Sequence, residues 1–267
     1  MHPYTVTETK NVLNTCAAYA DAWKLKFSAD KCKIVVFNVP NPLTTWKLGS
    51  ITIKTQTWDK YLTNTFSSTR GDGPHLSNRL QAAVRMFHTL KERGILGPNR
   101  PLDWATEVVQ SKIWSLLDVG INITNIYGPE HEKFRRDRDT LQKQVGACLL
   151  GANCTSSIDG ILGELGWPSM CDRDELNTAR FYLRLAYTNP DNLAHKITHK
   201  LIDLHANNPA SLPQHVRTAL DICQEFKLDF VNSTLVREKK KAIQSFTTLA
   251  GTRWSNRIRS SHNLKML

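Results

Sequence analysis

A change of hydrophobic period at residues 71–74 constrains the fold of this chain more than any other feature. Before Gly71-Asp72-Gly73-Pro74, residues 33–66 hold short apolar runs separated by turn residues, a pattern that predicts strands. After it, apolar residues recur at helical spacing almost to the end of the chain. The sequence therefore predicts a mainly α protein of the α+β class, with a small antiparallel hairpin unit followed by a long helical part.

The N-terminal elements are marked by caps and turns. Thr5 and Glu8 fit a capping box, which predicts a helix that begins there. The apolar run 33–38 predicts a buried strand. Residues 46–53 predict a β-hairpin whose two strands are joined by the two-residue turn Gly49-Ser50. Residues 58–66 predict one more strand, so that residues 33–66 form a small antiparallel sheet.

The helical part divides at Gly and Pro residues, which interrupt helices. The spacing of its apolar residues predicts a series of helices over residues 75–93, 101–119, 130–150, 157–165, 173–187, 190–206 and 212–226, with a last one from about Thr234. Gly151 ends the third of these. We therefore divide the chain into residues 1–70, 71–151 and 152–267.

The charge is positive and uneven. The formal net charge of the 267 residues is +11, which favours an anionic partner and, first of all, nucleic acid. Residues 1–70 hold nine Lys/Arg against four Asp/Glu, and residues 234–267 hold eight against one. Residues 151–233 are mildly acidic, with seven against ten. A basic protein without such a partner is the alternative reading.

The cysteine pattern and the hydropathy favour a protein of the cytoplasm or the nucleus. The six cysteines form no CxxC pair and suit neither a zinc site nor a disulfide framework, so we expect reduced, mostly buried thiols. No apolar run reaches the length that crosses a membrane, and the first residues lack the apolar stretch of a signal peptide. We expect no membrane partner.

Two segments of residues 19–66 carry a resemblance to a known family. Residues 23–37 read Trp-Lys-Leu-Lys-Phe-Ser-Ala-Asp-Lys-Cys-Lys-Ile-Val-Val-Phe, which is a Trp at a helix end, a Lys in a turn and an apolar strand. Residues 60–63 read Lys-Tyr-Leu-Thr. These segments resemble the reverse transcriptases of non-LTR (LINE-type) retrotransposons, in which a motif D lysine precedes a primer-grip hairpin that often reads K-Y-L-G. Thr63 stands in place of the glycine.

Later segments follow the order of the same family up to about Lys200. They are Arg79-Leu80-Gln81-Ala82-Ala83, Tyr127-Gly128-Pro129-Glu130, which is similar to a Y-G-x-E element, and residues 162–168, which are similar to an L-G-W element. The resemblance implies that residues 1–70 are the end of the palm, residues 71–151 thumb-like helices, and residues 152–267 a C-terminal helical region with a basic tail. It also implies nucleic-acid contacts by Lys60, Tyr61 and Arg79.

The family's catalytic motif has no match in this sequence. Nucleotidyl transfer needs paired carboxylates that hold two divalent metals, and the resemblance implies that this x-A-D-D motif would precede the first helix. Tyr19-Ala20-Asp21-Ala22 holds one aspartate, which cannot bridge two metals. We therefore expect no cofactor in this chain, although an intact parent would use Mg2+. Lys31 matches the motif D lysine, whose implied role is general acid, but a solvated turn lysine is the alternative.

Two further clusters are candidates for binding. The basic tail holds Lys239, Lys240, Lys241, Arg253, Trp254, Arg257 and Arg259, in which the cations would neutralise phosphates and Trp254 would stack on a base. A targeting signal or a solvated helix face are the alternatives. His195 and His199 lie four residues apart without a third metal ligand, so we interpret them as surface or half-buried residues. Residues 130–143 predict a self-compensated exposed face.

Together these features predict a fragment or derivative of a retrotransposon RNA-directed DNA polymerase that is inactive alone and binds RNA or DNA. Its other expected partner is the fingers and palm part of the polyprotein. The alternatives are a non-enzymatic helical interaction module and a decayed copy without function.

Overall fold

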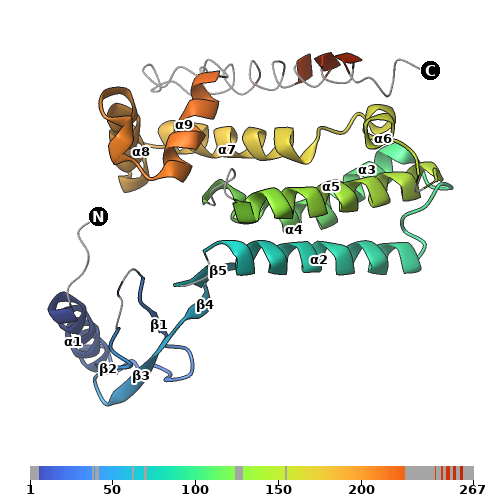
Figure 1. Ribbon diagram of the computed structural model, residues 1–267. Coiled ribbons are helices and arrows are strands. Elements are labelled where there is room, and N and C mark those ends of the chain that lie inside the picture. Colours follow the sequence, from blue (N-terminus) through green and yellow to red (C-terminus); the bar gives the residue numbers. More distant parts are fainter. Residues whose placement is uncertain are drawn as a thin grey trace. The chain divides into compact units, whose positions relative to one another are not determined.

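The computed structural model describes residues 6–37, 39, 42–61, 63–68, 71–123, 129–153 and 155–225, and eight single positions between Gln244 and Ser260 (Figure 1). The chain is mainly helical with a small amount of sheet, so the predicted fold class is confirmed. It divides into two compact units, residues 1–75 and residues 76–267. The three-part division made from the sequence stays a prediction.

The first unit is a helix packed on a small sheet. Helix α1 (Val6–Ala22) contacts strand β2 (Thr45–Leu48), and β2 forms an antiparallel hairpin with β3 (Ile51–Gln56). Gly49, in the turn between them, has φ +58°, a conformation that glycine adopts without strain, so the predicted hairpin is confirmed. Among the described residues, the core of this sheet contains the buried side chains of Trp46, Leu48 and Ile53, with partly buried apolar residues packed against them.

The predicted all-antiparallel sheet is wrong at its first strand. Strand β1 covers only Ile34–Val35, and it pairs in parallel with β3 at the register Ile34 to Thr55. A two-residue turn forces β2 and β3 to run in opposite directions. Since β1 is parallel to β3, it runs opposite to β2, and it pairs with β3 because β3 lies between β1 and β2 in the sheet.

The single strand predicted over residues 58–66 is a second hairpin. Strands β4 (Trp58–Tyr61) and β5 (Asn64–Ser67) pair antiparallel, with Trp58 opposite Ser67 and Lys60 opposite Thr65. The backbone N–H of Thr65 donates to Nδ1 of His75 at 3.2 Å, and the His75 side chain is buried. This contact anchors β5 to the first turn of helix α2.

The second unit is a bundle of helices. It contains most of α2 (Gly73–Glu92), α3 (Leu102–Val109), α4 (Ser115–Asp118), α5 (Pro129–Leu150), α6 (Ile158–Leu165), α7 (Met170–Ala186), α8 (Leu193–Asn207) and α9 (Gln214–Glu225). A π-helical turn, η1 (Gln110–Trp114), joins α3 to α4, so the predicted helix over 101–119 is continuous but irregular. Short 3-10 turns lie at Ile121–Ile123 and Pro209–Ser211.

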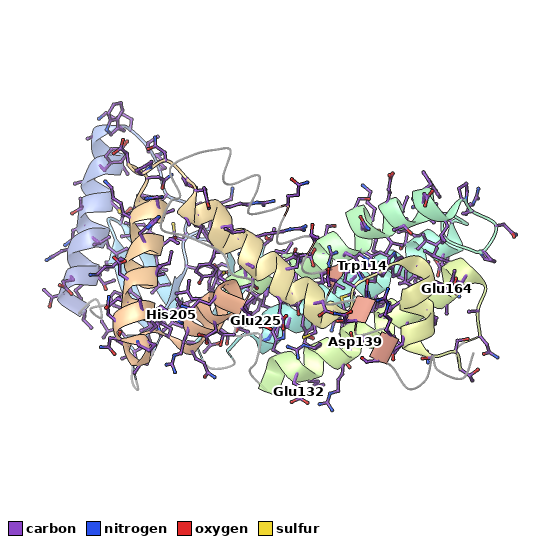
Figure 2. All side chains as sticks on the ribbon, turned by 90° about the horizontal axis from the view of Figure 1, so that it is seen from above. Trp114, Glu132, Asp139, Glu164, His205 and Glu225 are labelled. Atoms are coloured by element: carbon purple, nitrogen blue, oxygen red, sulfur yellow. The ribbon has the colours of Figure 1, made fainter. Side chains whose placement is uncertain are left out.

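Helix α7 organises the core of this unit, since it contacts α5, α8 and α9. Trp114 (Figure 2) packs edge-on against Trp167, with ring centroids 5.6 Å apart. His205 of α8 lies 2.9 Å from a carboxylate oxygen of Asp221 on α9. These contacts hold the later helices to one another.

Two helix starts differ from the prediction for a local reason. Helix α7 begins at Met170, three residues early, because Ser169 caps it by accepting a hydrogen bond from the Asp172 N–H at 3.2 Å. Helix α8 begins at Leu193, three residues late, because Asn192 caps it through a 2.9 Å bond from the Ala194 N–H. Asparagine and serine side chains at these positions satisfy backbone groups that the helix leaves open.

The thiols are less buried than expected. Of the described cysteines only Cys223 is fully buried, Cys16 is exposed, and Cys32, Cys148 and Cys171 are intermediate. Cys154 lies outside the described residues. Among the described helices, none has both the length and the apolarity needed to cross a membrane.

Candidate nucleic-acid interface

The β4–β5 hairpin exposes aromatic and cationic side chains together. Trp58 is 58% exposed and Tyr61 is 65% exposed, and Lys60 between them is also exposed. Side chains alternate across a strand, so Trp58 and Lys60 point to one face and Asp59 and Tyr61 to the other. The Lys33 ammonium lies 3.3 Å from Asp59 and neutralises this carboxylate. The cation of Lys60 therefore lies on the same strand face as the exposed Trp58 ring, and the exposed Tyr61 ring lies on the other face.

The turn of this hairpin holds its second residue, Thr63, in a backbone conformation that glycine adopts most easily. Residues 62 and 63 join β4 to β5, and Thr63 has φ +75°. This left-handed conformation is unfavourable for a β-branched residue and easy for glycine. The backbone at position 63 therefore favours glycine, the residue found there in the hairpins that residues 60–63 resemble. Leu62 itself lies outside the described residues.

The other residues predicted from the resemblance lie on separate elements. Lys31 is exposed in the turn after α1, where its N–H donates to the Ser28 carbonyl at 3.1 Å. Arg79 lies in α2, in the second unit, with a half-buried side chain. The structure brings Lys60 and Tyr61 together on β4, whereas Lys31 belongs to the turn after α1 and Arg79 to the second unit.

The basic tail falls mostly outside the described part of the chain. Lys239, Lys240, Lys241, Arg253, Trp254 and Arg257 all belong to the part that is not described. Arg259 is described, as an exposed residue in a helical turn. The tail therefore stays a prediction from the sequence.

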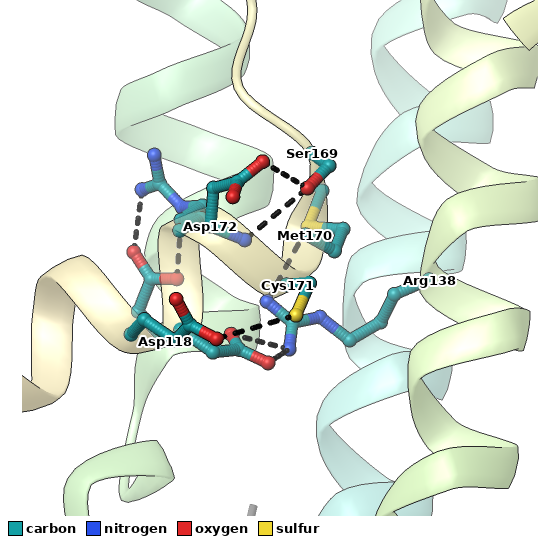
Figure 3. A network of polar contacts seen from close by, with 9 residues as sticks. Asp118, Arg138, Ser169, Met170, Cys171 and Asp172 are labelled. Atoms are coloured by element: carbon teal, nitrogen blue, oxygen red, sulfur yellow. Dashed lines mark hydrogen bonds and ion pairs between the residues drawn. The ribbon is translucent and has the colours of Figure 1, made fainter. Parts of the chain in front are cut away.

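The predicted exposed face of residues 130–143 is only partly correct: Arg136 and Asp137 are exposed, but α5 turns Arg138 into the core. Arg138 is fully buried, and its Nη1 donates to both carboxylate oxygens of Asp174 on α7 at 2.7 Å (Figure 3). Its Nη2 lies 3.3 Å from the sulfur of Met170, and its guanidinium stands 5.1 Å from the ring centroid of Phe134. Burial raises the pKa of the Asp174 carboxyl, and the charge of Arg138 opposes that rise.

A second ion pair, between Arg173 and Asp118, also lies at the N-terminal end of α7. Nε of Arg173 donates to Asp118 at 3.0 Å, and both side chains are partly exposed (Figure 3). On the neighbouring turn, the Ser169 hydroxyl donates to the Asp172 carboxylate and the Cys171 thiol to Glu175. The polar side chains of this turn are thus engaged in structural contacts.

The titratable groups of this cluster are shifted away from catalytic use. Burial raises the pKa of Cys171 to about 11, so the nucleophilic thiolate is scarce at neutral pH. Burial, assisted by the charges of Arg138 and Arg135, lowers the pKa of His131 to about 3, so the imidazole is neutral. Both shifts fit a packed core, in which charged forms are unfavourable unless they are paired.

His195 and His199 are neighbours on α8, with ring centroids 4.1 Å apart, and both are half-buried as expected. In the part of the chain that the structure describes, no three His, Cys, Asp or Glu side chains are grouped so that they could hold a metal ion.

Sequence reasoning missed the Arg138–Asp174 pair and, apart from Tyr61, the exposed aromatic residues of the first unit. The periodicity of α5 carried one usable signal, because Phe134, Arg138, Leu141 and Val145 share one helix face. Searches with the sequence and the structure found no matching family model, no matching curated protein and no matching solved structure.

Proposed function

We propose that this chain binds nucleic acid and does not polymerise it, as a derivative of a non-LTR retrotransposon reverse transcriptase would. The observation that carries the proposal is strand β4, on which Trp58, Lys60 and Tyr61 are all exposed, with Trp58 and Lys60 on one face. Proteins that bind single strands combine cations, which attract phosphates, with aromatic rings, on which bases stack. The net charge of +11 supports the same partner.

The sequence supports the proposed lack of polymerase activity. Two-metal catalysis needs paired carboxylates, and the 267 residues contain no x-A-D-D motif. Asp21, in the most similar segment, is an exposed residue of α1. We expect no primer extension by the purified chain with primer, template, deoxynucleotides and magnesium, under conditions in which an active reverse transcriptase extends the same primer.

The test is a fluorescence polarisation titration with labelled single-stranded oligonucleotide. Lys60→Ala and Tyr61→Ala should each weaken binding about tenfold, because a phosphate contact or a stacking contact is lost. Lys112→Ala and Trp104→Ala, at exposed positions of the second unit, serve as matched controls and should leave the affinity unchanged. Equal affinities for all four variants would contradict the proposal.

A second candidate function, docking on a polypeptide, is favoured by a different observation. Among the described large apolar side chains that are exposed, twelve belong to the first unit and four to the second. Five of the twelve are aliphatic and offer nothing to a nucleic acid: Val6, Val12, Leu25, Val39 and Leu43. A polypeptide such as the fingers and palm part of a polyprotein would cover them.

This second candidate is tested by affinity capture after nuclease treatment, with Val12→Asp as the variant and Leu193→Asp as the control. Both side chains are exposed, at 51% and 70%. A partner that survives nuclease and is lost only with Val12→Asp would support docking through the first unit. Recovery that is equal for both variants would argue against it.

A further inference from the structure

We propose that the C-terminal end of α1 is a second stacking site for single-stranded nucleic acid, formed by Tyr19 and Trp23 with Lys24 and Lys26. This inference rests on the proposed nucleic-acid binding and adds a site that lies outside the β4–β5 hairpin. Both aromatic side chains are largely exposed to solvent, Trp23 at 66% and Tyr19 at 58%. Two neighbouring exposed aromatic rings indicate an interaction surface better than a single exposed apolar residue does.

The two rings stand next to each other. Tyr19 and Trp23 are one helical turn apart, and their ring centroids lie 6.0 Å apart at an interplanar angle of 37°. Neither ring reaches the buried cluster of the sheet, which α1 contacts through Leu13 and Ala17 on another face. The pair therefore presents open π-faces, on which unpaired bases of any sequence can stack.

The backbone fixes this pair in place. The N–H of Leu25 donates to the carbonyl of Ala20 at 2.8 Å, and the N–H of Lys24 donates to Asp21 at 3.3 Å. This is the Schellman arrangement that closes a helix, with Lys24 at the left-handed position, φ +54°. An ordered backbone at this helix end reduces the conformational entropy that is lost when a base stacks on the two rings.

A lysine at the left-handed position 24 suggests that its side chain has a binding role. Glycine is the residue that a Schellman cap prefers, and a lysine there costs stability. Lys24 and Lys26 are both exposed, and with Lys31 they outnumber the two acidic residues of this stretch, Asp21 and Asp30. The excess positive charge beside open aromatic faces matches a polyanion with exposed bases, and fits a purely apolar polypeptide less well.

The experiment compares labelled oligothymidylate with a duplex of equal length, in polarisation titrations of the full chain. Trp23→Ala should weaken single-strand binding about tenfold and leave duplex binding unchanged, because only unpaired bases stack. Trp104→Ala, an exposed tryptophan of the second unit, is the matched control. Circular dichroism should show that both variants keep the helical content of the parent.

Lys24→Gly separates binding from structure. Glycine relieves the left-handed position, so the unfolding midpoint should rise, while the single-strand affinity falls and the salt slope decreases by about 0.7. A purely structural Lys24 would raise stability and leave affinity unchanged, which would overturn the proposal. The proposal would also be overturned if Trp23→Ala left oligothymidylate binding unchanged. The same holds if Trp23→Ala weakened binding to anionic lipid vesicles while binding to the oligonucleotide stayed the same. If the parent chain binds no oligonucleotide at low salt, the proposed function itself fails.

Discussion

Arg138 and Asp174, which are 36 residues apart in the sequence, form a buried ion pair in which one nitrogen bonds both carboxylate oxygens at 2.7 Å. The pair joins α5 to α7 at the centre of the helical unit. A buried charge without its partner costs several kcal/mol of stability, so removing either Arg138 or Asp174 alone should destabilise the fold strongly.

Asp174→Ala should therefore lower the free energy of unfolding by about 3–5 kcal/mol, because it leaves the Arg138 charge buried and unpaired. Replacing both residues, Arg138→Met with Asp174→Leu, should recover most of that loss. Asp118→Ala breaks the partly exposed pair with Arg173 and should cost at most about 1 kcal/mol. Urea unfolding measures all three variants. Equal losses for Asp174→Ala and Asp118→Ala would contradict the assignment of a buried pair.

The pH dependence of stability should carry a contribution from His131. Its pKa is lowered from 6.5 to about 3 in the folded chain, and its side chain is 1% exposed. The stability that it contributes is complete above pH 6.5 and is lost as the pH falls toward 3, because the unfolded chain binds the proton first. His131→Phe should flatten the stability profile between these values. His88→Phe, at an exposed position of α2, should leave the slope as it is in the parent.

The close approach of α5 and α6 depends on Gly146. A Cβ at this position would stand 2.4 Å from Cγ2 of Ile161 and 2.9 Å from Cδ1 of Leu165. Gly146→Ala should destabilise the chain by about 1–3 kcal/mol despite the higher helix propensity of alanine. Adding Ile161→Ala should relieve part of the clash. Gly251→Ala, whose Cβ would meet nothing within 4 Å, is the control and should show no loss in thermal unfolding.

Glycine at position 63 should stabilise the hairpin turn between β4 and β5. Thr63→Gly removes the cost of a β-branched residue at φ +75°, and we expect about 1 kcal/mol of added stability. Thr57→Gly, between β3 and β4 and without a positive φ, should instead destabilise, since glycine loses more entropy on folding. Thermal unfolding followed by far-UV circular dichroism distinguishes the two. A loss of stability with Thr63→Gly would show that the turn does not hold this conformation.

The sequence predicted those parts of the fold that depend on local signals. The hairpin around Gly49-Ser50 and the end of α5 at Gly151, with φ +63°, follow from what glycine permits. The helix starts at Ser169 and Asn192 could also have been read from their capping residues. The parallel pairing of β1 with β3 could not, because a long connection leaves the strand direction open.

The candidate site was only partly predictable for the same reason. Lys60 and Tyr61 were found through a local motif, whereas the exposure of Trp23 and Trp58 depends on what the rest of the unit fails to cover. Arg138 was predicted to be exposed but is buried. A run of alternating charges fits salt bridges along an exposed helix as well as it fits burial of one arginine against Asp174. Only the tertiary packing decides between these.

The most direct test of nucleic-acid binding is the salt dependence of the affinity of the full chain for single-stranded oligonucleotide. Binding through lysines and arginines releases counterions, so the logarithm of the association constant should fall linearly with the logarithm of salt concentration, by about 0.7 per phosphate contacted. We predict measurable binding at low salt and a slope that reflects several contacts. No binding at low salt, or an affinity that salt does not change, would contradict the account.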